Sequence, residues 1–189
     1  MSGNRVFPQK AVVLRTGGLG DFVLTVPLLV SMVEAGVRVT VATRRSYFEI
    51  LGELCAKLSF IDAEELFVSN ESKVPPENFS GATVFSFWKD SDGSLEARLE
   101  TFGIHELVEL ESRPLTSPHM VKRIFQDVGI QWGEKLYQRS WLRVNELDGD
   151  CLWVHPGSGS PVKNLPLSWF VQRIERWLAD GGDKVVVSF

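Results

Sequence analysis

Short apolar runs alternate with amphipathic segments along most of the chain. Segments that are apolar or alternate between apolar and polar residues predict strands at 11–14, 37–42, 65–68, 82–87, 105–110, 151–154 and 185–187. Apolar residues at helical spacing predict helices at 47–58, 94–102, 120–128 and 167–179. Such alternation predicts parallel strands joined by right-handed crossovers. The predicted fold class is α/β: a Rossmann-like parallel sheet from residue 10 to about 112, with helices on both faces, and a further β-α-β that begins near Cys151.

The first amphipathic segment contains a proline that leaves two interpretations open. The apolar run 22–33 is interrupted by Thr25, Pro27 and Ser31. Because proline fits without distortion only in the first turn of a helix, either a helix starts at Asp21 and kinks at Pro27, or a short turn precedes a helix capped by Thr25. The run is too short to span a bilayer, and no secretory signal precedes it. We therefore expect no transmembrane segment.

Two glycine-rich junctions between a strand and a helix are the strongest candidates for function. The first, residues 17–21, reads Gly-Gly-Leu-Gly-Asp. It does not fit the dinucleotide fingerprint, because Val23 stands where Gly or Ala is needed, and it lacks the Gly-Lys-Ser/Thr of a P-loop. Asp21 is either the N-cap of the following helix or a general base that points into a cleft.

The second junction, residues 155–166, follows the apolar strand at 151–154. Exposed N–H groups, a helix start and a lysine suit a phosphate or diphosphate. The residues that supply them are Gly157, Ser158, Gly159, Ser160 and Lys163. An ordinary βα turn is the alternative, because Gly, Ser, Pro and Asn are common turn residues.

Taken in order along the chain, these motifs resemble glycosyltransferase family nine, which contains the bacterial ADP-heptose:lipopolysaccharide heptosyltransferases. Three segments match. The first is 12–14 with Arg15, Gly17-Gly18-Leu19-Gly20-Asp21 and Leu24-Thr25-x-Pro27-Leu28-Leu29. The second is Pro118-His119-Met120-Val121, and the third is Val154-His155-Pro156-Gly157-Ser158-Gly159-Ser160 with Lys163 and Pro166-Leu167-x-x-Phe170. The resemblance implies a GT-B fold, in which two Rossmann-like domains face each other across a cleft. It predicts an acceptor-side domain at 8–144, a linker at 145–150 and the first β-α-β of a donor-binding domain at 151–189.

The resemblance also implies an activity and roles for single residues. Family members transfer heptose from an ADP-activated donor to the lipopolysaccharide core, with inversion. The expected setting is therefore the cytoplasm, at the inner-membrane surface. Asp21 matches the family's proposed base, and Ser158, Ser160 and Lys163 match its contacts to the donor diphosphate. The acceptor-side loop consists of Gly17, Gly18, Leu19 and Gly20.

The length of the chain departs from the family pattern. Two Rossmann-like domains need about 300 residues or more on domain-size grounds, and this sequence has 189. We expect the donor-binding domain to be incomplete, and the chain alone to show little transferase activity. A non-catalytic relative that keeps the fold as a binding or scaffold subunit is one alternative. An unrelated Rossmann-type oxidoreductase is another, disfavoured by Val23 and by the arginines that follow the second strand.

Composition narrows the possible chemistry. The net charge of -4 argues against a general nucleic-acid binder. Two cysteines 96 positions apart and three scattered histidines have no metal-ligand spacing, so we predict no metal and no cofactor beyond the nucleotide-sugar co-substrate. Two segments that follow strands keep two interpretations each. Arg44-Arg45 either meet an anionic acceptor or are simply solvated. Trp88-Lys89-Asp90 either line the acceptor side or form a capped strand end with the tryptophan in the core.

Overall fold

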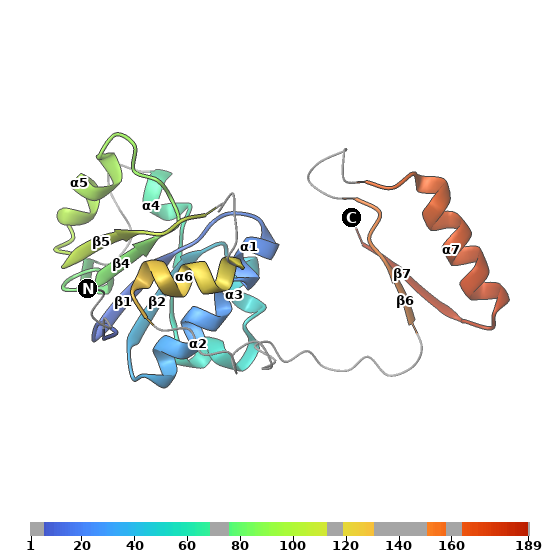
Figure 1. Cartoon of the computed structure of the whole chain (residues 1–189), viewed down its shortest axis with the longest axis horizontal. Coiled ribbons are helices and arrows are strands. Elements are labelled where there is room, and N and C mark those ends of the chain that lie inside the picture. The colour runs from blue at the N-terminus through green and yellow to red at the C-terminus, as the bar shows by residue number, and fades with distance from the viewer. Residues whose placement is uncertain (1–5, 69–75, 113–118, 131–150, 158–163, 189) are drawn as a thin grey trace. The chain divides into compact units, whose positions relative to one another are not determined.

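The computed structural model describes residues 6–68, 76–112, 119–130, 151–157 and 164–188. The chain divides into two compact units, Met1–Arg143 and Val144–Phe189, which are described separately (Figure 1). The candidate linker at 145–150 lies outside the described residues.

The first unit is built on a five-stranded parallel sheet, as the sequence predicts. Its strands are β1 (Lys10–Leu14), β2 (Arg38–Thr43), β3 (Ser59–Asp62), β4 (Thr83–Ser86) and β5 (Glu106–Glu109). The spatial order is β3-β2-β1-β4-β5. The chain therefore adds β2 and β3 on one side of β1, and then adds β4 and β5 on its other side. The point at which the strand order reverses, the topological switch point, lies between β1 and β4.

Helices cover both faces of this sheet (Figure 1). They are α1 (Leu19–Val23), α2 (Val26–Glu34), α3 (Arg45–Glu49), α4 (Glu65–Val68), α5 (Ser94–Glu100) and α6 (Met120–Val128), with 3-10 turns η1 (Gly52–Lys57) and η2 (Pro76–Asn78). Side chains of a strand alternate between faces, so Val13 packs under α2 and α6, and Val12 packs under α4 and α5. This two-sided burial explains why the buried positions of the central strands are apolar or carry the small hydroxyl side chains of Thr40, Thr43, Thr83 and Ser86.

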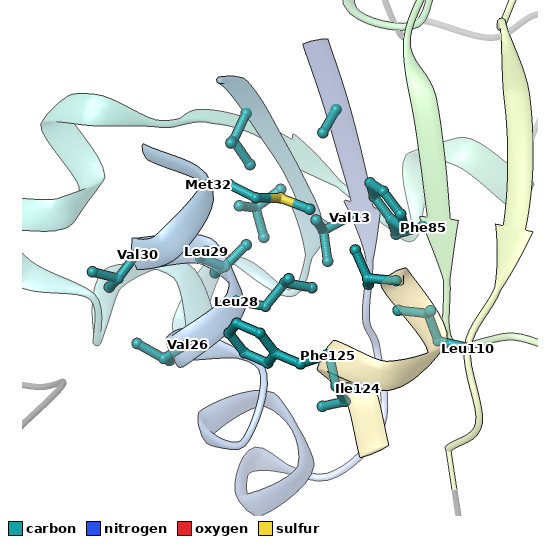
Figure 2. Packing of buried hydrophobic residues seen from close by; sticks show 14 of the residues in the cluster. Val13, Val26, Leu28, Leu29, Val30, Met32, Phe85, Leu110, Ile124 and Phe125 are labelled. Carbon is teal, nitrogen blue, oxygen red and sulfur yellow. The ribbon is translucent and has the colours of Figure 1, made fainter. Parts of the chain in front are cut away.

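The core beneath α2 and α6 is dense with large aliphatic and aromatic side chains. Figure 2 shows this cluster, in which both helices contact the sheet residues Val13 and Phe85. Its fully buried members include Leu28, Leu29, Met32, Ile124 and Phe125. Each such side chain contributes about 1.5–3 kcal/mol on burial. This packing gives β1 and β4 a fixed base for the loops at their carboxyl ends.

Two expected elements differ in the structure. The helix expected at 47–58 ends at Glu49, because Gly52 adopts a left-handed φ of +55° that an α-helix cannot continue, and a 3-10 turn follows. The segment 65–68 is the short helix α4 and not a strand. Parallel pairing with β2 is supplied instead by Ser59–Asp62, whose single buried side chain, Ile61, gives little apolar signal.

The proline in the first helical segment has an arrangement close to the second one expected, but a short helix stands in place of the turn and the Thr25 side chain makes no capping hydrogen bond. Helix α1 ends at Val23, and α2 begins at Val26 with Thr25 as its N-cap residue. Pro27 then occupies the first turn of α2, where its missing N–H costs nothing. The hydroxyl of Thr25 donates to the carbonyl of Asp21 (3.1 Å), so it joins the two helices.

The second unit contains the predicted β-α-β. Its elements are β6 (Cys151–Val154), α7 (Leu167–Ala179) and β7 (Lys184–Val187), with the two strands parallel and paired from Cys151↔Lys184 to Val154↔Val187.

Candidate functional site

The carboxyl ends of β1 and β4 form the candidate site of the first unit. Open α/β sheets bind ligands outside the strand ends at the switch point, and here that point lies between these two strands. The chain segments after the strands are joined to each other: Phe87 N–H donates to the Leu14 carbonyl (3.2 Å), and the indole N–H of Trp88 donates to Thr16 Oγ1 (2.5 Å). The glycine-rich junction and the end of β4 therefore lie side by side.

Asp21 is held on the rim of this site by both carboxylate oxygens. Oδ2 accepts the N–H of Gly18 at 3.2 Å, and Oδ1 lies 3.4 Å from a guanidinium nitrogen of Arg15. The side chain nevertheless remains 45% exposed. The interpretation of Asp21 as the N-cap is wrong in position, because Gly18 is the N-cap and Asp21 is the third helical residue, reaching back to it. The carboxylate is thus fixed and still accessible to a ligand.

Arg15 is a residue of the site to which the sequence assigned no role, although it stands in the segment that resembles the family. It follows β1 directly, its N–H donates to the Ala42 carbonyl (3.0 Å), and its side chain is only 3% exposed. The guanidinium lies 4.2 Å from the ring centroid of Phe87, which is a favourable place for a cation. The carboxylate of Asp21 balances the charge that burial would otherwise penalise. Two features of the sequence point to Arg15: it is a cation immediately after an apolar strand, and it belongs to the segment that resembles the family.

The glycines of the junction differ in whether the surrounding atoms leave room for a side chain. A Cβ added at Gly17 would lie 2.9 Å from Asp21 Oδ2, which is closer than real Cβ contacts. Gly17 is therefore needed for the carboxylate to fold back. A Cβ at Gly18 would meet that oxygen at an ordinary 3.7 Å, and one at Gly20 would meet no atom within 4 Å. Leu19 is exposed on α1.

The residues after β4 divide between two roles. Asp90 accepts the N–H groups of Leu95 (3.0 Å) and Glu96 (2.8 Å), so it caps α5. Lys89 forms an exposed ion pair with Glu111 (3.6 Å). Trp88, by contrast, is half-buried and bonded to the glycine-rich junction. Of the three, Trp88 is the one that the structure joins to the candidate site.

The arginines after β2 are exposed and rest on aromatic rings. The guanidinium of Arg44 lies 5.7 Å from the ring centroid of Tyr47, and that of Arg45 lies 4.9 Å from the ring centroid of Phe60. Tyr47 also contacts Phe22 of α1, with ring centroids 5.7 Å apart. Arg44 and α1 therefore both contact the ring of Tyr47.

In the second unit, the structure describes only part of the candidate diphosphate loop. Gly157 follows β6, whereas Ser158, Gly159, Ser160 and Lys163 lie outside the described residues. The ends of the two strands are joined by Ser188, whose Oγ accepts the indole N–H of Trp153 (3.0 Å) and lies 2.9 Å from His155 Nδ1. The diphosphate site stays a prediction.

Among the residues that the structure describes, no group of three or more His, Cys, Asp and Glu side chains is arranged to hold a metal ion. Among the helices that the structure describes, none has the length and apolar content needed to cross a membrane.

Comparison with known proteins identifies solved structures that share this fold. No family model matches the sequence, and no curated protein matches it. Among solved structures, the chain is similar to a glycosyl transferase family 9 protein from Veillonella parvula, with a TM-score of 0.59, 14% identity, and coverage of 95% of this chain and 62% of that one.

Two structures of the E. coli heptosyltransferase WaaC are also similar. The structure with ADP has a TM-score of 0.58 at 14% identity, and the structure with ADP-2-deoxy-2-fluoro heptose has a TM-score of 0.62 at 13% identity. Each match covers 95% of this chain and 68% or 69% of the other. The chain thus spans about two thirds of the length of these structures. Over that span, it has the fold of the family 9 glycosyltransferase structures.

Proposed function

We propose that this protein is a glycosyltransferase that moves a sugar from a nucleotide-sugar donor to an acceptor hydroxyl. The observation that carries the proposal is the carboxylate of Asp21, which is fixed by Arg15 and Gly18 and half-exposed at the switch point of the sheet. The fold shared with glycosyltransferase structures supports this choice over an oxidoreductase. The glycine pattern around Val23 supports the same choice.

The chemistry needs a base on the acceptor side. The acceptor oxygen attacks the anomeric carbon of the donor sugar and forms a new C–O bond. The bond from that carbon to the diphosphate breaks, and the nucleoside diphosphate leaves with the electron pair. Asp21 takes the proton that the acceptor hydroxyl loses. Attack from the face opposite the leaving group inverts the configuration at the anomeric carbon.

The finer assignment is an ADP-heptose-type donor and a lipopolysaccharide-core acceptor at the inner-membrane surface. It is supported by the motif resemblance and by the fold shared with WaaC, whose structures contain ADP or an ADP-heptose analogue. Under this proposal, the acceptor meets the loop 17–20 of the first unit. The donor diphosphate meets Gly157, Ser158, Gly159, Ser160 and Lys163, where N–H groups and an ammonium stabilise the leaving group.

The test replaces Asp21 with its uncharged isostere in the protein as encoded by its gene. Turnover of Asp21→Asn, measured as nucleoside diphosphate released from ADP-heptose, should fall by about 10²–10⁴-fold. Donor affinity should hardly change. The matched control is Asp62→Asn, because Asp62 also accepts a backbone N–H, from Glu64 (3.1 Å), at the end of another strand of the same sheet. Asn serves that turn equally well, so this variant should keep wild-type turnover.

Stability is measured in parallel, because the Asp21 substitution is not neutral. Asn can still accept the Gly18 N–H, but it places no negative charge opposite the buried guanidinium of Arg15. A lower melting temperature is therefore expected for Asp21→Asn, and rates are compared well below it. Wild-type turnover in Asp21→Asn would refute the base assignment. Absence of diphosphate release by the wild-type protein with ADP-heptose and other nucleotide sugars would refute the proposed function.

A further inference from the structure

Trp88 is unusually well fixed for a residue at the end of a strand. Its backbone N–H donates to Ser86 Oγ (3.0 Å), and that hydroxyl donates to the Trp88 carbonyl (3.0 Å). Ser86 itself is fully buried. The indole N–H donates to Thr16 Oγ1, in the chain segment that leads to Gly17. Both the backbone and the ring plane are thereby set before any ligand arrives.

The indole lies at the boundary between the core and the site. It packs against the cluster beneath α4 and α5, which includes Val12, Leu14 and Leu95, but it is not closed off from solvent. The preceding residue, Phe87, is 4% exposed and already fills the core on the other face. A phenylalanine or leucine would meet the packing need at position 88 without adding an N–H that requires a partner. The indole therefore gives the site something that the core does not need.

We propose that Trp88, a partly buried residue, binds the acceptor, and that its indole receives the C–H face of the acceptor sugar. The electron-rich face of an indole attracts weakly positive C–H hydrogens, and a rigid aromatic ring offers a large contact area at a low cost in conformational entropy. The bond to Thr16 sets the ring in register with the segment that carries Asp21. This inference rests on the proposed function for the identity of the ligand.

Two substitutions separate the ring surface from the hydrogen bond. Trp88→Phe keeps an aromatic face and loses the donor to Thr16, whereas Trp88→Leu keeps apolar volume and loses the aromatic face. The acceptor KM should rise about tenfold in Trp88→Leu, as loss of a contact of about 1.4 kcal/mol predicts, and less than threefold in Trp88→Phe. The donor KM should be unchanged in both. Trp169→Leu, at an indole 41% exposed on α7, is the control and should change neither constant.

A second measurement does not depend on turnover. The protein has six tryptophans, so the indole region of a ¹⁵N-labelled sample holds six candidate signals, and Trp88→Phe identifies the one from Trp88. Titration with a deacylated, heptose-free lipopolysaccharide core oligosaccharide should shift that signal, and maltotriose should not. A shift in a protein that transfers no sugar would uphold the glycan site while the proposed function fails. Active enzyme with an unmoved Trp88 signal, or with an unchanged acceptor KM in Trp88→Leu, would overturn this inference alone.

Discussion

The substitution Gly17→Ala tests whether the position of the Asp21 carboxylate matters. The added Cβ would lie 2.9 Å from Asp21 Oδ2, whereas ordinary contacts begin near 3.4 Å, so the oxygen must retreat by about 0.5 Å. Oδ2 is the free end of a side chain, so the carboxylate moves and the backbone stays. The move weakens the hydrogen bond from Gly18, which is worth about 1 kcal/mol.

A second effect of the same substitution offsets this loss. The φ of Gly17 is not in the left-handed region, so alanine fits the backbone there. Replacing glycine by alanine at such a position stabilises a protein by about 0.4–1 kcal/mol, because the unfolded chain loses conformational entropy. The two terms nearly cancel, and the melting temperature should change by only a few degrees. The expected change is therefore in activity: a misplacement of 1 Å costs about 10²-fold, so half that distance should lower kcat about tenfold.

The assay compares kcat, as nucleoside diphosphate released at saturating substrates, with the melting temperature. Gly20→Ala serves as the stability control, because its Cβ would meet nothing within 4 Å and alanine is favoured over glycine in a helix by about 1 kcal/mol. Its melting temperature should rise. Full kcat in Gly17→Ala would show that the carboxylate can move without consequence. A large loss of stability in Gly17→Ala would show that the backbone, and not the side chain, gives way.

Three further outcomes are expected. Arg15→Met should lower kcat, because it removes the charge that faces and positions Asp21. It should destabilise the fold by only about 1 kcal/mol in thermal unfolding, because the half-exposed Asp21 carboxylate can return to water. An unchanged kcat would count against a positioning role. Asp90→Ala should cost about 1–2 kcal/mol in chemical denaturation through loss of the α5 cap, whereas Lys89→Ala, which breaks only an exposed ion pair, should stay within about 0.5 kcal/mol. Burial raises the pKa of the Cys55 thiol, and a carboxylate nearby raises it further, so iodoacetamide at pH 8 should modify Cys55 much more slowly in the folded than in the urea-unfolded protein; equal rates would refute this.

The central sheet could be predicted from the sequence because burial on both faces requires strands that are rich in apolar residues. β1 and β4 are covered by helices on each side, so their buried residues are apolar except for the small hydroxyl side chains of Thr83 and Ser86. β3 lies at the edge of the sheet, where Ser59 and Asp62 are compatible with pairing, and its apolar signal is too weak to find. The apolar residues at 65–68 form a helical turn that places Leu66 in the core. Periodicity cannot distinguish a strand from a helix over four residues.

The candidate site was only partly visible in the sequence for a different reason. Asp21 stands in a recognisable pattern, but its partners depend on the fold. Arg15 meets it only because α1 turns back over the end of β1, and Phe87 comes beneath that arginine from the next strand in the sheet. The hydrogen bond between Trp88 and Thr16 joins residues 72 positions apart, and no local sequence pattern predicts it.

The glycines of the first junction indicate that this segment is not optimised for stability. At Gly17, the Asp21 carboxylate occupies part of the space that a Cβ would need. Nothing comparable requires glycine at positions 18 and 20: neither has a left-handed φ, and the described residues leave room for a Cβ at both. A serine N-cap in place of Gly18 and an alanine in place of Gly20 would together favour α1 by about 1 kcal/mol. Helix α1 has only five residues and lacks this stabilisation, and it stands next to a fixed and half-exposed carboxylate. Such a conflict between local sequence and stability is expected where the backbone must stay open for a ligand.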